Sequence, residues 1–331
     1  MTTALHEELP GRTFITWQAK FLLLAAIGGS SFLFMKVGLQ SFSAIQVATF
    51  RLVLGALVLL AVLRARGGRL PRAAQRWAHL SVSGALLATL PCLLFVASTE
   101  RVSSALAGVG SATTPLFAVL FGFVLVPHDR PAPFKLMAVL AGFVGVVIIL
   151  EPWQSVGRPD PLGFGMSLAA AASWALGWAY YCRFMQESDA DDLPISTALL
   201  LVGAAQMIPV LLAWWWVNRD AHASPWLGYV TAADDAWLMP LLSVLVLGAI
   251  GTAVAYAFQF DVVRGAGATV SASITYLVPV VSVSLGVGVL GEHVGGPQLL
   301  GAAIGVVSVA VIGLPTHKRV RERIRIAETQ P

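Results

Sequence analysis

Polar and aromatic side chains recur at helical spacing inside long apolar stretches of this chain. Trp174 and Trp178 are one turn apart, and Thr252, Tyr256 and Gln259 follow one another at i, i+4 and i+7, so each set lies on one face of a helix. A few fixed polar groups in an apolar surround are what a small amphipathic solute needs for binding. The spacing therefore predicts a binding surface within the apolar part of the chain.

Two prolines stand in the middle of apolar stretches, each preceded by a hydroxyl one turn earlier. Ser111 precedes Pro115, and Thr275 precedes Pro279. A proline inside a helix removes one backbone hydrogen bond and bends the helix. We expect Pro115 and Pro279 to act as hinges, and a fixed kink that shapes the packing is the alternative role.

We expect nine side chains to line one substrate cavity. They are Ser30, Ser31, Ser111, Trp174, Trp178, Tyr256, Gln259, Ser271 and Thr275. For each hydroxyl the alternative is a hydrogen bond to its own backbone or to a neighbouring helix. For each tryptophan the alternative is a place at the membrane interface. Trp174 and Trp178 lie near the middle of their stretch, which favours the cavity.

Ionisable side chains are rare inside the apolar stretches and count as functional hypotheses where they occur. Lys36 lies near the end of its stretch, from which its amine reaches the interface. Arg51 lies deeper, roughly 12 Å from the end of its stretch at 1.5 Å per residue. We expect Arg51 to hold the bundle together by capping helix carbonyls, and a substrate carboxylate is the alternative partner.

The sequence contains no set of residues typical of catalysis or metal binding. Its six histidines lie in tails, loops and ends of apolar stretches, and its two cysteines, Cys92 and Cys182, lie in apolar runs. No glycine-rich phosphate loop of the Walker type is present. We therefore expect no enzymatic activity, no cofactor, no metal and no nucleic-acid partner.

Ten apolar stretches position these side chains. Hydrophobic residues make up 57% of the 331 residues and charged residues 11%, and a bilayer crossing needs about 20 mostly apolar residues. The stretches span roughly residues 17–38, 43–63, 77–99, 102–126, 133–150, 161–184, 194–217, 237–260, 266–290 and 297–314. Because backbone polar groups in lipid must be paired internally, the prediction is an all-α integral membrane protein with ten transmembrane helices.

Lysine and arginine gather on one side of this predicted topology. Five arginines follow the second stretch, at residues 64–76, and five basic residues lie in the C-terminal tail, at residues 318–325. Ten crossings put both clusters on the same side. Because cytoplasmic loops are enriched in basic residues, we expect both termini in the cytoplasm and the protein in the plasma membrane, the inner membrane of a bacterium.

The second half of the chain repeats the first at an offset of 164 residues. Pro115 corresponds to Pro279, and Pro133, which opens a short apolar stretch, corresponds to Pro297. With five stretches each, the two halves must cross the membrane in opposite directions, which is the inverted-repeat plan of secondary transporters. The predicted segments are a cytoplasmic tail at 1–16, five-helix repeats at 17–150 and 161–314, and a basic tail at 315–331.

Four segments carry a resemblance to a known family. They are GGSSFLFMKVGL, QVATFRLVLGALVLL, ERVSSALAGVGSATTPLFAVL and GVGVLGEHVGGPQLLGAAIGVVSVAVIGL. In this order they resemble the drug/metabolite transporter superfamily of EamA type, and most closely its YddG-like amino-acid and metabolite exporters, over about residues 15–315. The first half departs from the pattern, because His128-Asp129 stands where the second half has Gly291-Glu292.

The resemblance implies a central cavity lined by the first, third, fourth, sixth, eighth and ninth stretches. It also implies export of a small amphipathic metabolite by alternating access, with amino acids, aromatic ones included, as the expected class. The expected partners are the solute and membrane lipid, with the chain as a monomer or a homodimer. The alternatives are a passive channel and a membrane-embedded enzyme acting on lipid.

Overall fold

A computed structural model of the chain describes residues 16–102, 104–125, 132–151, 160–185, 192–219, 224–226, 237–281 and 296–314. Both predicted tails and the junctions at 128–129 and 291–293 lie outside these ranges. The labelled helices are α1 (Trp17–Gly38), α2 (Ala44–Ala65), α3 (Ala74–Gly84), α4 (Leu90–Arg101), α5 (Ser104–Ser111), α6 (Thr114–Leu125), α7 (Pro133–Leu150), α8 (Pro161–Phe184), α9 (Asp192–Val217), α10 (Leu238–Gly248), α11 (Ala255–Ala266), α12 (Ala268–Ala272) and α14 (Gly296–Gly313).

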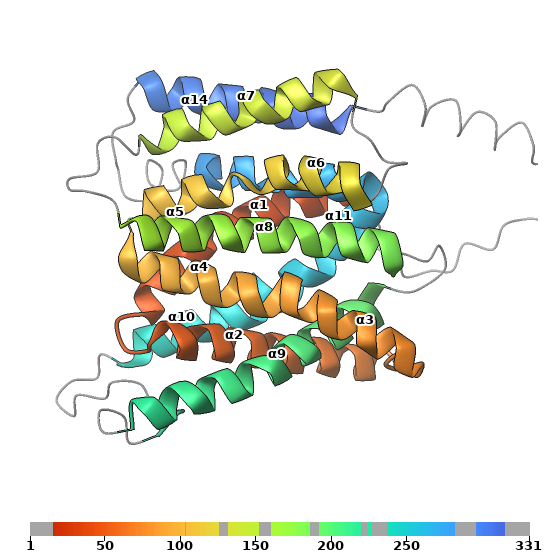
Figure 1. The fold of residues 1–331 in the computed structure, drawn as a ribbon, viewed down its shortest axis with the longest axis vertical. Coiled ribbons are helices and arrows are strands. Elements are labelled where there is room, and N and C mark those ends of the chain that lie inside the picture. The colour runs from red at the N-terminus through yellow and green to blue at the C-terminus, as the bar shows by residue number, and fades with distance from the viewer. Residues whose placement is uncertain are drawn as a thin grey trace, which may run out of the picture.

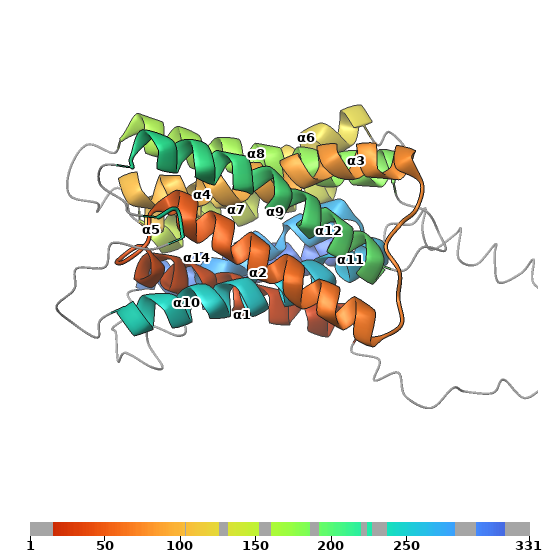
Figure 2. The same cartoon turned by 90° about the horizontal axis from the view of Figure 1, so that it is seen from below.

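The helices lie side by side in one bundle (Figures 1 and 2). Seven helices in the described ranges are long and apolar enough to cross a membrane, and three shorter apolar helices cover 133–149, 268–281 and 299–313. No strand occurs in these ranges. The all-helical prediction is therefore confirmed for the part of the chain that the structure describes, while ten crossings in two inverted repeats stay a prediction.

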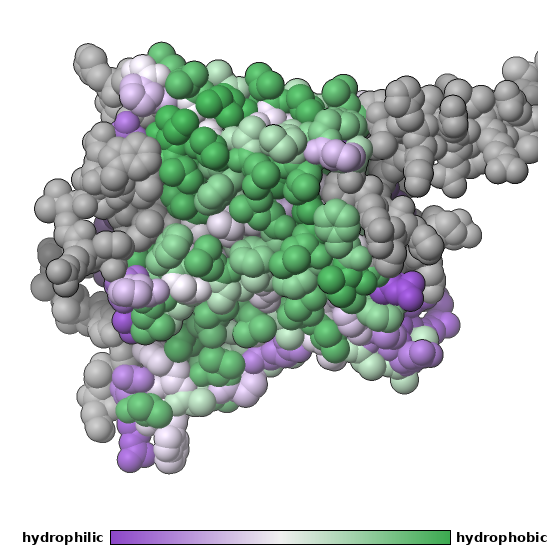
Figure 3. Space-filling model, turned by 45° about the horizontal axis from the view of Figure 1, so that its top comes forward, coloured by the Kyte–Doolittle hydropathy of each residue, from purple (hydrophilic) through white to green (hydrophobic). Residues whose placement is uncertain are grey.

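The sides of the bundle are apolar and its two ends are polar. Figure 3 shows a green band of hydrophobic residues between purple patches at either end. Leu33, Val124, Met137 and Val307 are among the large apolar side chains exposed on the sides. Such continuous exposed apolar surface marks contact with something other than water, and here its position between two polar ends fits a bilayer.

We name the two ends of the bundle after α1, which begins at the Trp17 end and finishes at the Gly38 end. A capping box starts α2 at the Gly38 end, where Ser43 Oγ accepts from the Gln46 N–H and Gln46 Oε1 accepts from the Ser43 N–H. Glu100 Oε1, at the end of α4, accepts from the Ala44 N–H at 2.9 Å. These contacts fix where α2 begins, and with it the depth of every α2 side chain.

The closest helix contacts pair one half of the chain with the other. α2 packs on α9, α4 packs on α8, and α1 packs on α10 and α11. Small residues allow this approach, because a Cβ on Gly84 would lie 2.8 Å from a methyl group of Val202 and a Cβ on Gly248 would lie 2.8 Å from Leu54. The two halves are therefore interleaved in space and do not form separate bundles.

Helices α7 and α14 form a pair at one edge of the bundle (Figure 1). A Cβ on Gly301 would lie 2.6 Å from the Gly145 carbonyl oxygen, and a Cβ on Gly145 would lie 2.9 Å from the Gly301 carbonyl oxygen. The glycine faces of these helices are thus already used against each other.

Two π-helical turns interrupt matching helices of the two halves. The turn η1 (Ala85–Thr89) joins α3 to α4, and η5 (Ala249–Val254) joins α10 to α11. They begin at residues 85 and 249, which are 164 residues apart, the offset of the sequence repeat. Wide turns of this type are often found at functional sites, and the sequence analysis did not anticipate them.

Candidate functional site

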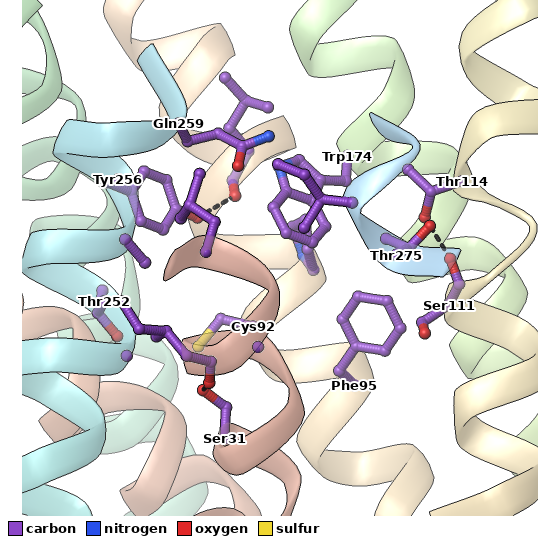
Figure 4. A pocket seen from close by; sticks show the side chains of 18 of the residues that line it. Ser31, Cys92, Phe95, Ser111, Thr114, Trp174, Thr252, Tyr256, Gln259 and Thr275 are labelled. Atoms are coloured by element: carbon purple, nitrogen blue, oxygen red, sulfur yellow. Dashed lines mark hydrogen bonds between the residues drawn. The ribbon is translucent and has the colours of Figure 1, made fainter. Parts of the chain in front are cut away.

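A cavity of about 160 Å³ lies in the middle of the bundle (Figure 4). This volume is below the roughly 300–1,000 Å³ of pockets that hold drug-sized ligands, so it suits a small solute. Its main polar and aromatic lining residues are Ser31, Arg51, Cys92, Phe95, Ser111, Thr114, Trp174, Trp178, Thr252, Tyr256, Gln259, Ser271 and Thr275. Both π-helical turns contribute, η1 through Leu87 and η5 through Gly251 and Thr252.

Eight of the nine predicted site residues line this one cavity. They are Ser31, Ser111, Trp174, Trp178, Tyr256, Gln259, Ser271 and Thr275. Ser30 is not among the lining residues, and its Oγ donates to the Ile27 carbonyl at 3.0 Å. The structure brings the predicted set together from helices far apart in the sequence, and binding of a solute to that set stays a prediction.

Three of the predicted lining hydroxyls donate their proton to a backbone carbonyl three or four residues earlier in the chain. Ser31 Oγ bonds to Ile27 O at 2.7 Å, Ser111 Oγ to Gly108 O at 2.9 Å, and Thr275 Oγ1 to Ala272 O at 3.0 Å. This is the backbone role that the sequence left open as their alternative. Their oxygens keep lone pairs toward the cavity, but their protons are committed.

The indole N–H groups of the two lining tryptophans are buried donors without an acceptor among the described residues. The indole Nε1 atoms of Trp174 and Trp178 are buried and have no hydrogen-bond partner among the described residues. Trp178 is only 3% exposed and is held edge-on by Tyr181 and Phe260, with ring centroids 5.8 and 5.0 Å away. Because buried N–H groups are rarely left without an acceptor, these two need one that the described residues do not supply.

Tyr256 and Gln259 tie α11 to the opposite wall of the cavity. The Tyr256 hydroxyl donates to the Leu87 carbonyl in η1, and Gln259 Nε2 donates to Ser271 Oγ at 2.7 Å in α12. The Tyr256 ring and the Gln259 amide therefore line the cavity in fixed positions. The polar atoms of both residues serve at least in part to connect the walls.

Arg51 lies in the cavity wall, and the sequence analysis assigned it a structural role. Its Nε donates to Thr252 Oγ1 at 3.1 Å, and Nη1 lies 3.7 Å from Met35 Sδ. Gly55, one turn along α2, permits this approach, since a Cβ there would lie 2.8 Å from Thr252 Cγ2. Arg51 is the one charged residue among the described residues that line the cavity, and α2 was not expected to line it.

Sequence reasoning missed several cavity residues besides Arg51. Cys92, Phe95 and Thr114 line the wall without having been anticipated from the sequence. Thr252, which shares the predicted helical face of Tyr256 and Gln259, also lines it. For Cys92 and Phe95 no signal was present, because an apolar residue facing a cavity looks the same in sequence as one facing a neighbouring helix.

The predicted hinge prolines differ in their surroundings. The helical segment that contains Pro115 is interrupted at Ala112–Thr113, between α5 and α6. There Thr113 Oγ1 donates to Gly110 O at 2.6 Å. In the segment that contains Pro279, the interruption lies at Ser273, and residues 274–281 are helical. The break therefore precedes Pro279 by more than a turn, and hinge motion at either site stays a prediction.

Ion pairs join the helices at both ends of the bundle. At the Trp17 end, Lys20 of α1 pairs with Asp261 of α11, and Arg264 of α11 pairs with Asp192 of α9. At the Gly38 end, Arg101 Nη1 lies 3.3 Å from Asp160 Oδ2. The described residues contain no group of three or more His, Cys, Asp or Glu side chains placed to hold a metal ion.

These features define a helical membrane protein with a solute-sized cavity inside its bundle. The chain belongs to the EamA-like transporter family, whose model matches residues 16–151 and again residues 161–314. The resemblance noted in the sequence is thereby confirmed. The chain is thus a membrane transporter of this family.

Curated relatives are similar over most of their length. The chain is 27% identical over 289 residues to the uncharacterized inner membrane transporter YedA of Escherichia coli K12, covering 87% of each protein. It is 27% identical over 304 residues to a probable amino-acid metabolite efflux pump of the same organism, covering 91% of this chain and 96% of the relative. A solved crystal structure with 19% identity superposes with a TM-score of 0.68 over 89% of this chain and 95% of that one, which shows the shared fold.

Proposed function

We propose that the protein exports small amphipathic metabolites, with amino acids as the first class, by alternating access. The observation that carries this proposal is the cavity between the interleaved halves of the chain, lined by aromatic rings and a few polar groups. The printed name of one relative, a probable amino-acid metabolite efflux pump, supports both the direction and the substrate class.

Matching elements support a two-repeat plan. Helices α3, α5 and α7 begin at residues 74, 104 and 133, and α10, α12 and α14 begin at 238, 268 and 296. Pairs such as α2 with α9 and α7 with α14 join equivalent elements of the two halves. Inverted repeats of this kind rock against each other around a midplane site in secondary transporters.

Orientation follows from the basic residues, and we propose that the Trp17 end faces the cytoplasm. A cysteine placed at Arg69 should be shielded from an impermeant reagent in intact cells, and one at His222 should be labelled. The chain should first be freed of Cys92 and Cys182. Labelling at Arg69 with protection at His222 would overturn this orientation.

We further propose that transport follows the solute gradient, without obligatory coupling to protons or sodium. Coupled carriers usually hold an ionisable carboxylate or histidine deep in the membrane. No Asp, Glu or His occurs among the described residues that line the cavity. The direction of net movement is then set by which side holds more solute, as in an overflow exporter.

The test is counterflow in proteoliposomes that contain the purified full-length chain. Unlabelled amino acid trapped inside should drive transient accumulation of labelled amino acid, with saturation at high concentration. A channel would give flux without counterflow, and a lipid-modifying enzyme would give neither. With equal solute on both sides, an imposed pH or sodium gradient should cause no net uptake, and uphill movement would disprove the uncoupled mechanism.

A further inference from the structure

We propose that Arg51 anchors the carboxylate of the transported solute, so that a carboxylate, and not an ammonium group, is the feature that the cavity requires. This inference rests on the proposed transport function and adds the chemical class of its substrate. It departs from the structural role that the sequence favoured for Arg51. Its basis is the balance of charge, donors and acceptors in the cavity wall.

The guanidinium of Arg51 retains unused donors. Guanidinium carries five N–H donors, and two of them have partners among the described residues, Thr252 Oγ1 at 3.1 Å and Met35 Sδ at 3.7 Å. Both partners are neutral, and the second is a weak acceptor. A positive charge at this depth in a membrane is costly without an anion or water beside it.

The hydrogen bond to Thr252 positions the guanidinium and leaves its outer edge available. Because Thr252 holds Nε and Met35 Sδ takes one hydrogen of Nη1, the outer fork consists of the remaining Nη1 hydrogen and Nη2. Two parallel N–H groups of this kind bind both oxygens of one carboxylate, with more strength and directionality than a single point charge gives. The structural contact and the proposed ligand therefore use different edges of the same group.

The remaining polar groups of the cavity also favour an acceptor-rich solute. Trp174 and Trp178 add two buried indole N–H donors without acceptors. The Cys92 thiol lies against the Ala48 carbonyl, with Sγ and O 3.7 Å apart.

An ammonium group finds no charged partner in this wall. No carboxylate side chain occurs among the described lining residues, so no side chain there balances the charge of an ammonium. The hydroxyl oxygens of Ser31, Ser111 and Thr275 can accept hydrogen bonds from it, and an aromatic face adds about 0.5–2 kcal/mol, but all of these partners are neutral. The cavity is thus complementary to a carboxylate with an apolar or aromatic body.

The experiment measures thermal stabilisation of the detergent-solubilised full-length protein by matched probes, since a ligand that binds the folded state raises Tm. Alanine, leucine and phenylalanine carry both charged groups. Their amides lack the carboxylate, while propionate, 4-methylpentanoate and 3-phenylpropionate lack the ammonium. We expect at least one carboxylate, with or without an ammonium, to raise Tm, and its amide partner to have no effect at the same concentration.

Variants assign the effect to Arg51. Arg51→Lys keeps the charge but loses the fork, so the half-maximal concentration should rise about tenfold, and Arg51→Gln should abolish the response. Arg101→Gln, at the Gly38 end and outside the cavity, is the matched control and should respond as the wild type does. The comparison of acids with amides in the wild-type protein stands even if an Arg51 variant fails to fold.

Each outcome has a defined meaning. An amide that stabilises as well as its acid, a full response in Arg51→Gln, or no response to any carboxylate overturns the anchor. Counterflow of a solute without a carboxylate would in that case leave the transporter function standing. Stabilisation by carboxylates without counterflow of any of them would support the anchor and contradict the proposed function.

Discussion

Positive side chains have different partners in two regions of the molecule. At the Trp17 end, Lys20 and Arg264 are each paired with an aspartate of another helix. In the cavity, Arg51 contacts a hydroxyl and a thioether and no acid among the described residues. The paired charges in this protein therefore connect helices, whereas a charge that faces the cavity without a counter-ion is available to a solute.

The paired charges also have a place in alternating access. The Lys20–Asp261 pair joins α1 to α11 across the two halves of the chain, and the Arg264–Asp192 pair joins α9 to α11 within the second half. We expect these pairs to separate whenever the cavity opens at the Trp17 end, so they belong to the conformation that is closed there. The predictions below test the contrast between the two regions, in order of expected effect.

The largest effect on stability is expected at Asp192. Its side chain is 10% exposed, and that of its partner Arg264 is 37% exposed. Asp192→Asn leaves the guanidinium without a counter-charge, and we expect a loss of about 1–3 kcal/mol, between the values for surface and buried pairs. Thermal unfolding of the solubilised protein measures this loss. Arg51→Gln should destabilise far less, and equal destabilisation by both would mean that Arg51 is structural.

A slightly smaller effect, on solute binding, is expected at Trp174. Trp174→Ala removes an aromatic face and an unpaired donor from the cavity, and we expect a loss of about 1–2 kcal/mol, or several-fold in apparent affinity. Counterflow as a function of solute concentration measures this change. Trp216→Ala is the control, because Trp216 is 65% exposed near the end of α9. Normal transport by Trp174→Ala would mean that this ring only packs against its neighbours and does not bind the solute.

A weaker effect is expected for the second ion pair at the Trp17 end. The side chains of Lys20 and Asp261 are 22% and 33% exposed, so their attraction is screened by solvent and salt. Asp261→Asn should lower stability by about 0.2–1 kcal/mol. The difference from the wild type in Tm should shrink as the salt concentration rises. A difference as large as that of Asp192→Asn would show that exposure does not rank these pairs.

The smallest effect is expected at Asp160, in the exposed pair of the Gly38 end. The hydrogen bond from the Leu162 N–H, with Arg101 as a further cause, lowers the pKa of the Asp160 carboxyl from its ordinary value of 3.8. A lowered pKa in the folded state stabilises the protein above the unfolded pKa, and this contribution is lost as pH falls through the folded pKa. Asp160→Asn keeps the helix cap. Its Tm should therefore fall less than that of the wild type between pH 5 and pH 3, and parallel curves would contradict the assignment.

The apolar stretches could be predicted from sequence because each helix must carry its own apolar surface. The ends were less accurate, since polar residues continue some helices. Arg101 belongs to α4 and Asp261 to α11, although both lie beyond the predicted stretches. The π-helical turns could not be predicted, because a wide turn depends on contacts such as the bond from Tyr256 to the Leu87 carbonyl, which joins residues far apart in the chain.

The cavity was predicted in part for a similar reason. Trp174, Tyr256 and Gln259 could be chosen because aromatic and amide groups are unusual at mid-depth in an apolar helix. The position of Arg51 depends on α2 approaching η5 at Gly55. This contact joins the two halves of the chain, so it cannot be inferred from residue spacing along one helix. Ser30 is adjacent to Ser31 in sequence but is not among the residues that line the cavity, because neighbouring residues on a helix point in different directions.

A cavity whose described lining carries one fixed positive charge and no acid also determines how the membrane voltage acts on transport. If no ion accompanies the solute, the charge moved in each cycle is the charge of the solute itself. An anion leaving a cell whose interior is negative gains about 2.3 kcal/mol per 100 mV, whereas a zwitterion gains nothing from the voltage. The membrane voltage would then help to drive the export of simple carboxylates by this protein. The export of amino acids would be driven by their concentration gradient alone.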